Sequence, residues 1–504
     1  MGNRAVWLAA NIRAPELEQA MAKCGKDLGW NASALAAAMV AGLVPAAASA
    51  ARLPENILPT ATASAAAAKA AAPAGPAVSP PKATPPAAPA TIPTPATSSG
   101  VATATPAPAP IPVPDPVMTW SLTDAQALLV VIAKIGADGL LPDDYQPDAL
   151  RAAIAKGEGA ELDAQASRSF VWLAQDMRDG RTRMDSRLQW FVVDTDVDAN
   201  PVDALMERAL AAHDIAGVIA GLAPTHPDYA ALKAKLAALP KADKATRALV
   251  RINMDRWRWL PHDLGKFYLF TNVPEYQLRL TVDNTIIRSY KTIVGKPGTT
   301  ATPQLAEVVE GVIFNPTWTV PQSIVVGEGL GERLFNNPKQ AAREGYKVTK
   351  AADGTIIVVQ QPGANNSLGR LKLDMPNEHA IFLHDTNARQ LFNLPSRALS
   401  HGCVRTENAV QLGMTMARLG GGIPTTQTIE IANSGVYTKV PMTRTFPIYL
   451  TYFTYATNIA GKLTAFKDIY ARDAAVQASF AAPRAPWDGK RKSSEAIIKL
   501  DNPL

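Results

Sequence analysis

The spacing of apolar residues changes along the chain, and through its middle part that spacing is helical. A capping-box pattern at residues 123–126 precedes apolar residues at helical spacing, which are Leu128, Leu129, Ile132 and Ile135. A second apolar run ends at a helix-terminating Gly180 and consists of Phe170, Leu173 and Met177. Further helices are predicted over residues 202–212, 215–222 and 229–239. The pattern predicts an all-α domain over residues 118–250, in which no residue demands catalytic chemistry.

From Ile252 onward, the apolar residues follow the two-residue period of strands. A hairpin is predicted around an Asp-Asn turn at 283–284, preceded by the alternating residues Tyr276, Leu278, Leu280 and Val282. Further strands are predicted over residues 290–296, 427–431 and 446–455. The chain is therefore predicted to be an α+β multidomain protein whose second folded domain, residues 251–445, is mostly β.

Two features interrupt this β domain. Residues 321–361 have weak periodicity and a predicted helix near residues 338–344, so they are interpreted as an insertion that caps a neighbouring site or, alternatively, as a tolerated surface insertion. A helix is also predicted over residues 407–419, with its sheet-facing side chains being Val410, Met414 and Leu419. Residues 446–504 are expected to form a C-terminal strand, a closing segment and a tail.

The first fifty residues have the pattern of a signal peptide. An apolar run over residues 34–44 is followed by Ala-Ser-Ala at 48–50, a small-residue cleavage pattern. The run is short for a bilayer span, and a start at Met21 would give a better basic segment before it. We expect export to the periplasm, with an uncleaved anchor in the inner membrane as the alternative.

Residues 51–117 are rich in alanine, proline and threonine and hold only five charged residues. This composition cannot build a core, so a disordered, semi-rigid linker is predicted. The net charge of +6 suits work near anionic envelope polymers. No block of basic residues interleaved with aromatic ones is present, so nucleic acid is not an expected partner.

The candidate chemistry lies in Ser-His-Gly-Cys-Val-Arg at 400–405. Cys403 is one of two cysteines, and the other, Cys24, lies in the predicted signal. A lone thiol in an exported protein is a liability, which points to a nucleophile activated by an imidazole. His384, at the end of a short apolar run, is the candidate base. Gly402 permits a tight turn whose amides could bind an oxyanion, and Arg405 offers a fork for a carboxylate.

Two other interpretations of these residues stand beside catalysis. Cys403 could be an ordinary small buried side chain. His384, His401 and Cys403 could instead bind a metal, but no fourth ligand accompanies them, so no metal is expected. His401 has either a direct role or a structural role in the turn.

His384, fifteen intervening residues and Ser-His-Gly-Cys-Val-Arg together resemble the signature of the L,D-transpeptidases, which crosslink bacterial peptidoglycan. The order of histidine before cysteine is opposite to that of papain-like enzymes. Other phrases resemble the large Gram-negative subtype, with its helical scaffold domain and substrate-capping segment. These phrases lie at residues 139–145, 315–321, 361–369 and 375–377.

The resemblance implies a cysteine acyltransferase. Cys403 would attack the donor tetrapeptide stem, release D-alanine and form a thioester that a second stem converts into a 3→3 crosslink. His384 would be the general base and acid, oriented by the backbone carbonyl of Asp385, with the Gly402 amide at the oxyanion. His401 and Arg405 complete the implied catalytic set, and the implied substrate contacts are Trp318, Ser400, Asn366 and Gly369.

The same resemblance implies that no cofactor is needed and that carbapenems acylate the cysteine. The expected partners are peptidoglycan stem peptides, with other cell-wall synthesis proteins or an envelope lipoprotein as further candidates, and a monomer is expected. Three alternatives remain open at this point. Water could be the acceptor, giving an endopeptidase or carboxypeptidase; a lipoprotein lysine could be the acceptor; or the chain could bind peptidoglycan without catalysis.

Overall fold

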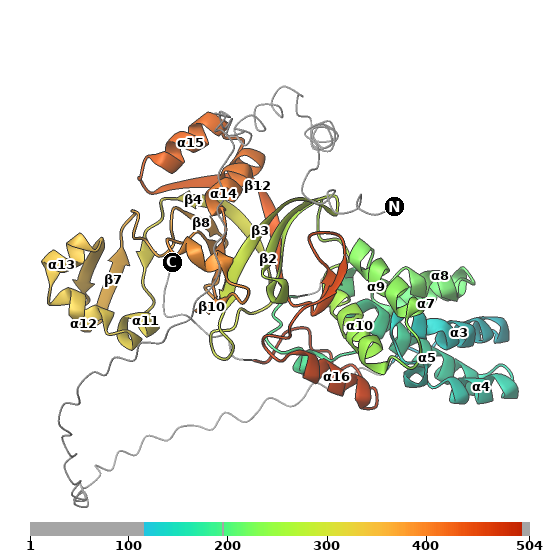
Figure 1. Cartoon of the computed structure of the whole chain (residues 1–504). Coiled ribbons are helices and arrows are strands. Elements are labelled where there is room, and N and C mark those ends of the chain that lie inside the picture. The colour runs from blue at the N-terminus through green and yellow to red at the C-terminus, as the bar shows by residue number, and fades with distance from the viewer. Residues whose placement is uncertain (1–114, 194–195, 496–504) are drawn as a thin grey trace, which may run out of the picture. The chain divides into compact units, whose positions relative to one another are not determined.

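The computed structural model describes residues 115–193 and 196–495 (Figure 1). The predicted signal with Met21 and Cys24, nearly all of the predicted linker and the last part of the predicted tail lie outside the described residues. Within the described part, no helix is both long enough and apolar enough to cross a membrane.

The region after the predicted linker is helical, as predicted. Its helices are α3 (Leu122–Lys134), α4 (Pro147–Lys156), α5 (Ala160–Asp179), α6 (Asp196–Ala199), α7 (Val202–Ala211), α8 (Ile215–Ala220), α9 (Pro227–Ala238) and α10 (Lys244–Trp257). Helix α3 begins after Ser121, whose hydroxyl accepts the Asp124 amide at 3.1 Å, and not at the predicted cap Thr123. Leu128 and Ile132 of α3 and Phe170 of α5 are fully buried in one core. The predicted helical face of this region is therefore the packed one.

The prediction of a mostly-β second region is confirmed, but its strands begin at Phe267 and not at Ile252, because residues 244–257 form α10. Asp243 caps the helix by accepting the Thr246 amide at 3.1 Å. Val250, Met254 and Trp257 are buried at helical spacing, which is the pattern of a helix and not of a strand. The tryptophans Trp257 and Trp259 are buried packing anchors, as expected.

The second region, residues 267–465, is built on strands. They are β1 (Phe267–Asn272), β2 (Gln277–Val282), β3 (Thr285–Gly295), β4 (Leu305–Phe314), β5 (Trp318–Thr319), β6 (Tyr346–Lys350), β7 (Ile356–Gln360), β8 (Leu371–Asp374), β9 (Leu383–His384), β10 (Ala398–Ser400), β11 (Val404–Thr406), β12 (Thr438–Thr451), β13 (Tyr455–Thr457) and β14 (Leu463–Ala465). The main sheet has the order β10-β3-β11-β9-β8-β4-β12-β1-β2, and β2 also pairs with β3, so the sheet closes on itself. The predicted turn joins β2 to β3, with positive φ at Asp283 and Asn284.

One predicted helix of this region is confirmed, but its most buried residues are not the ones predicted to face the sheet. One predicted strand is wrong. Helix α14 (Ala409–Gly421) packs on β4, β8 and β12, and its buried residues include Leu412 and Met416. The predicted contacts Val410 and Met414 are only partly buried. Residues 427–431, predicted as a strand, belong to helix α15 (Thr425–Asn433), because Thr428 and Ala432 are buried four residues apart.

Residues 318–360 form a small subdomain with its own core, which we call the cap. Three short helices, α11 (Gln322–Gly327), α12 (Leu330–Phe335) and α13 (Pro338–Arg343), gather beside the three-stranded sheet β5-β7-β6 (Figure 1). The helix predicted near residues 338–344 is α13. The cap core is separate from that of the main sheet and contains Val320, Val325, Leu334, Ala341 and Val358.

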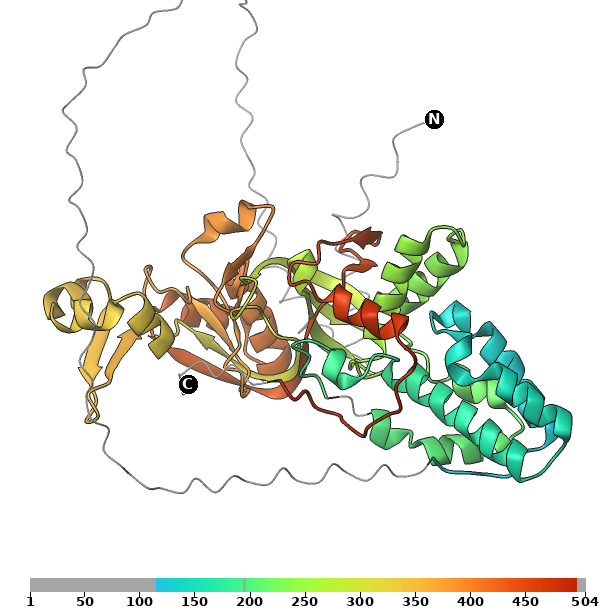
Figure 2. The same ribbon diagram turned by 90° about the horizontal axis from the view of Figure 1, so that it is seen from below.

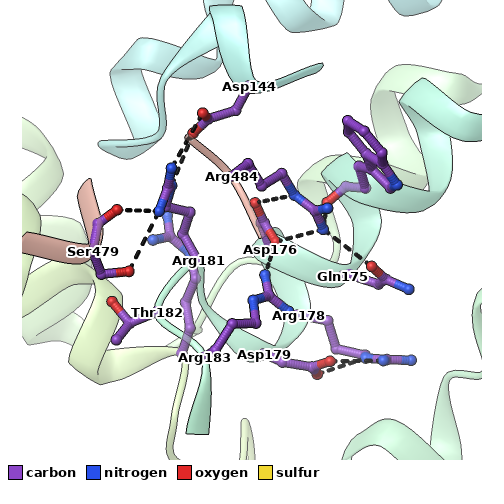
Figure 3. Close-up of polar contacts among 12 residues, drawn as sticks. Asp144, Gln175, Asp176, Arg178, Asp179, Arg181, Thr182, Arg183, Ser479 and Arg484 are labelled. Atoms are coloured by element: carbon purple, nitrogen blue, oxygen red, sulfur yellow. Dashed lines mark hydrogen bonds and ion pairs between the residues drawn. The ribbon is translucent and has the colours of Figure 1, made fainter. Parts of the chain in front are cut away.

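The C-terminal segment is not a free tail over its described length. Helix α16 (Asp473–Ala481) packs on α10, and the red segment in Figure 2 continues back to the helical region. There the Arg484 Nε lies 2.9 Å from Asp176 Oδ2, and both side chains are at most 2% exposed. Arg183 also pairs with Asp176, and Arg181 donates to backbone carbonyls of the C-terminal segment (Figure 3). This network of buried charges joins the end of α5 and the loop after it to the C-terminal segment.

Candidate active site

The predicted base and nucleophile come from two neighbouring parallel strands. Strand β9 ends at His384, and β11 follows Cys403 directly; the pairing places His384 opposite Arg405. The amide of Val404 donates to the Phe382 carbonyl at 3.0 Å, which fixes the start of β11 beside β9. Cys403 comes one residue before Val404, which is paired with Leu383, so the register of the two short strands brings segments about twenty residues apart to one place.

A cavity of about 650 Å³ opens over this edge between the main sheet and the cap. His384, His401, Cys403 and Arg405 line it from the sheet side. The cap contributes residues that the sequence did not single out, among them Ile324, Glu328, Leu330 and Tyr346. The cap therefore covers the predicted catalytic residues, as the interpretation of this segment as a substrate cap requires.

His384 is buried and held in one orientation. Its Nδ1 lies 2.5 Å from the backbone carbonyl oxygen of Asp385. A carbonyl can only accept, so Nδ1 carries the proton and Nε2 is left with a free lone pair. Burial, helped by the nearby Arg405 charge, lowers the imidazole pKa to about 3. The ring is therefore neutral at physiological pH, as a general base must be.

Cys403 is a free, half-buried thiol whose Sγ lies 3.7 Å from the Ala380 carbonyl oxygen. Burial raises its pKa to about 11, while the Phe382 backbone, Lys372 and Arg405 act in the opposite direction. The resting group is thus a thiol, and it needs a proton acceptor and positive charge nearby to react as a thiolate.

The turn that presents Cys403 is closed by Ser400. Its hydroxyl donates to the Cys403 carbonyl at 2.6 Å and accepts the Gly402 amide at 3.2 Å. Gly402 has φ of +122°, and a Cβ there would lie 3.1 Å from Ile381. The Gly402 amide is therefore bonded to Ser400 in this structure, and its oxyanion role stays a prediction.

Arg405 and His401 both line the cavity, but they differ in exposure. The Arg405 guanidinium is half-buried, and burial lowers its pKa. No hydrogen bond or ion pair joins it to another residue in the described ranges, so it is available to a substrate carboxylate. His401 is exposed at the cavity wall.

The predicted substrate contacts fall into two groups. Trp318 lines the cavity from β5, and the buried Ser400 lies at its floor. Asn366 and Gly369 are not among the lining residues. The Asn366 amide donates to backbone carbonyls of Pro316 and Gln361 at 3.0 Å. These bonds use the donors of Asn366 inside its own loop, so direct substrate contact has no support for this residue.

Gly369 supports the site indirectly, through its contact with Asp385. It has φ of +59°, and a Cβ there would lie 2.5 Å from Asp385 Cγ. The absent side chain lets the Asp385 carboxylate accept the Arg370 amide at 3.0 Å. The carboxylate is also 3.1 Å from Arg389 Nη2. Asp385 is therefore anchored through its carboxylate while its carbonyl orients His384, and the structure gives Gly369 this supporting place instead of the predicted substrate contact.

Sequence reasoning missed Lys372, a buried lysine of β8 whose Cα is paired with that of His384. Its position next to the site follows from strand register, which no local motif reveals. Among the described residues, no group of three or more histidine, cysteine or acidic side chains is arranged to hold a metal ion.

The site thus combines a closed β-sheet with a free thiol and an oriented imidazole that line one cavity. Residues 266–413 match the family model of the YkuD L,D-transpeptidase catalytic domain, and residues 118–236 match that of the Scaffold domain. The chain therefore carries an L,D-transpeptidase catalytic domain preceded by a scaffold domain.

A curated Haemophilus influenzae protein described as a putative L,D-transpeptidase is 29% identical over 220 residues, which is 41% of this chain and 44% of that protein. The match thus spans less than half of the relative's length. The L,D-transpeptidase from Mycobacterium smegmatis aligns over 37% of this chain and 58% of its own, with 12% identity and a TM-score of 0.19. L,D-transpeptidase 1 of Mycobacterium tuberculosis aligns over 37% and 61%, with 10% identity and a TM-score of 0.17.

Proposed function

We propose that this protein is an L,D-transpeptidase that forms 3→3 peptidoglycan crosslinks through a thioester on Cys403. The observation that carries the proposal is one cavity lined by a free thiol and by a neutral imidazole whose Nδ1 is fixed by the Asp385 carbonyl, 2.5 Å away. This arrangement leaves Nε2 as the one imidazole atom that can take a proton. The family match of residues 266–413 supports the same reaction class.

In the proposed acylation, His384 Nε2 takes the thiol proton as Cys403 attacks the carbonyl carbon between the third and fourth residues of a donor stem. The carbon–nitrogen bond breaks, and the amine of D-alanine leaves with the proton from His384. Arg405, which has no partner among the described residues, is placed to bind a stem carboxylate. The product of this half-reaction is a thioester.

In the second half-reaction, the side-chain amine of another stem's third residue attacks the thioester carbonyl. His384 takes a proton from the amine and returns it to the departing sulfur. The cap makes this acceptor preferable to water, because Trp318, Ile324 and Leu330 place apolar surface over the cavity. Water, or a lysine of an envelope lipoprotein, would give the alternative products.

We place this activity in the periplasm, either as a released enzyme or as one anchored by an uncleaved signal, because residues 34–50 have the pattern of a signal peptide. The partners that follow from the proposal are peptidoglycan stem peptides.

The decisive experiment is mass spectrometry of purified protein incubated with disaccharide-tetrapeptide, with wild type beside Cys403→Ala. We expect a 3→3 dimer and free D-alanine from wild type alone. If tripeptide and D-alanine form without dimer, the proposed activity becomes hydrolysis instead of transpeptidation. Equal absence of D-alanine from both proteins, together with no acylation of wild type by a carbapenem, would reject the acyltransferase proposal.

A further inference from the structure

Lys372 is a buried lysine that the proposed reaction does not use. It lies in β8 with 8% of its surface exposed, and its Nζ is 4.1 Å from the centroid of the Phe382 ring. No hydrogen bond joins this ammonium to another residue of the described chain. Burying an ammonium without a hydrogen-bond acceptor destabilises the folded state, so a functional reason for this lysine is expected.

Strand register places Lys372 on the face of the sheet that carries the site. Its Cα is paired with that of His384 in the adjacent antiparallel strand. Paired residues of neighbouring strands project to the same face, and so do residues two apart in one strand, such as Phe382 and His384. The Phe382 ring, which Lys372 covers, lies 5.5 Å from the His384 ring. The ammonium therefore belongs to the same group of side chains as the imidazole.

The carboxylate that acts on this ammonium, Asp374, is shared with a second lysine. Asp374 follows two residues later on the same strand, and its Oδ2 lies 2.6 Å from Lys439 Nζ at the surface. Burial lowers the pKa of Lys372, while the charges of Cys403 and Asp374 raise it. The titratable and charged groups around the sulfur and the ammonium are His384, His401, Arg405, Asp374 and Lys439.

We propose that Lys372 is the counter-charge of the Cys403 thiolate. It acts as an electrostatic positioning residue that lies beside the site but outside the cavity lining. Its positive charge favours the thiolate over the thiol, and it also keeps the resting imidazole neutral. Arg405 faces the substrate cavity, whereas Lys372 is absent from the cavity lining. Lys372 therefore keeps acting when a substrate carboxylate occupies Arg405. The catalytic meaning of this charge rests on the proposed function, but the charge effect itself does not.

The test measures the rate of Cys403 alkylation by iodoacetamide from pH 6 to pH 11, followed on the Cys403 peptide by mass spectrometry because Cys24 is a second thiol. Only the thiolate reacts, so below its pKa the rate is proportional to the thiolate fraction, and the midpoint is obtained by extrapolating that slope to the rate of a fully ionised thiol. In Lys372→Met we expect the midpoint to rise by about one unit and the rate at pH 7 to fall about tenfold. Lys372→Arg keeps a charge there and is expected to restore the wild-type midpoint. Lys291→Met, which removes an exposed lysine paired with Glu407, is the matched control and is expected to leave it unchanged.

An unchanged midpoint in folded Lys372→Met, or equal shifts in the Met and Arg variants, would overturn the proposal and leave Lys372 as a packing residue on Phe382. If the methionine variant does not fold, Lys372→Gln provides the same uncharged comparison. The readout needs no peptidoglycan. Failure of the crosslinking assay with an intact alkylation shift would therefore reject the proposed function alone.

Discussion

At the scale of single residues, the site depends on backbone carbonyls and amides as much as on side chains. The Asp385 carbonyl sets the tautomer of His384, and the Ser400 hydroxyl ties the two ends of the turn that presents Cys403. Neither contact is visible as a charge or a motif, yet both decide which atoms face the cavity.

The neutrality of His384 predicts the pH dependence of activity. Its pKa of about 3 lies well below the ordinary value, so the base is already deprotonated at pH 5. We expect kcat/KM for thioester formation to show no acid limb between pH 7 and pH 5, measured by acylation with a carbapenem. An acid limb centred near pH 6.5 would mean that the imidazole is hydrated and not buried. His384→Gln should lower the rate by about 10²–10⁴-fold at every pH.

Ser400→Ala removes both hydrogen bonds that close the turn. The Cys403 carbonyl and the Gly402 amide lose a buried partner, which costs about 1–3 kcal/mol of unfolding free energy. We expect at least tenfold slower alkylation of Cys403 and a lower urea midpoint. Ser323→Ala is the control, since Ser323 lines the same cavity from the cap. An equal effect of that substitution would show that the slower alkylation does not come from loss of the turn's hydrogen bonds.

The residues of the site were predictable to the extent that they are close in sequence. The run 400–405 delivers the turn, the thiol and the arginine together, and His384 ends a recognisable apolar run. Lys372 was not predictable, because its place beside His384 depends on antiparallel register across a loop. Asn366 and Gly369 matched a family phrase, but their contacts support the loop and Asp385 rather than the cavity.

At the scale of elements, the helices and strands with strong periodicity were predicted correctly. Short elements, and elements whose apolar residues do not follow one clear period, were not. The β2–β3 hairpin followed from alternation and its Asp-Asn turn. Residues 427–431 alternate in sequence but form part of α15, since their buried neighbours lie on a helical face. In α14 the predicted contacts were one position off, because small residues such as Gly413 and Ala417 take the face closest to the sheet.

The separate core of the cap predicts that it can be loosened by itself. Leu334 is fully buried among cap residues, and Leu334→Ala should cost about 2–5 kcal/mol of local stability. Hydrogen exchange should accelerate in β6 and β7 while β4 stays protected. Val326→Ala is the control, because Val326 is 76% exposed on the same subdomain. Loss of protection in β4 as well would show that cap and sheet unfold together.

At the scale of the whole chain, buried charges join the helical region to the C-terminal segment. Asp176 accepts from Arg183 and Arg484 (Figure 3). It also accepts from the Tyr145 hydroxyl. Asp176→Ala leaves two arginines without their carboxylate, so we expect a loss of about 3–5 kcal/mol in unfolding free energy, measured by urea denaturation. Asp198→Ala removes a 71% exposed partner of Arg491 and should leave the urea midpoint nearly unchanged. Similar losses in both variants would contradict this assignment.

His226 makes the same region sensitive to acid. Its Nδ1 accepts the Asp228 amide at the start of α9, and its ring stacks on Trp257 at 4.3 Å. Burial, followed by the Arg279 charge, lowers its pKa to about 4. The unfolded chain then binds a proton more readily than the folded one, so stability is complete above about pH 6.5 and falls as the pH drops towards 4.

The loss from His226 should approach about 1.4 kcal/mol per pH unit within that window, and His226→Gln should remove this part of the slope. Urea midpoints at pH 7 and pH 5 measure it. His384 contributes a slope of the same sign, so some dependence should persist in the variant. A slope unchanged by the substitution would mean that His226 is not the titrating group.

The return of residues 473–484 to the helical region also fixes an order of events during synthesis. Arg181 and Asp176 are made early, but their partners Ser479 and Arg484 leave the ribosome about three hundred residues later. Until then Asp176 is paired only with Arg183 and Arg181 only with Asp144, and without the C-terminal partners the helical region cannot reach its final stability. A nascent chain therefore cannot complete these contacts until residues 473–484 have been made.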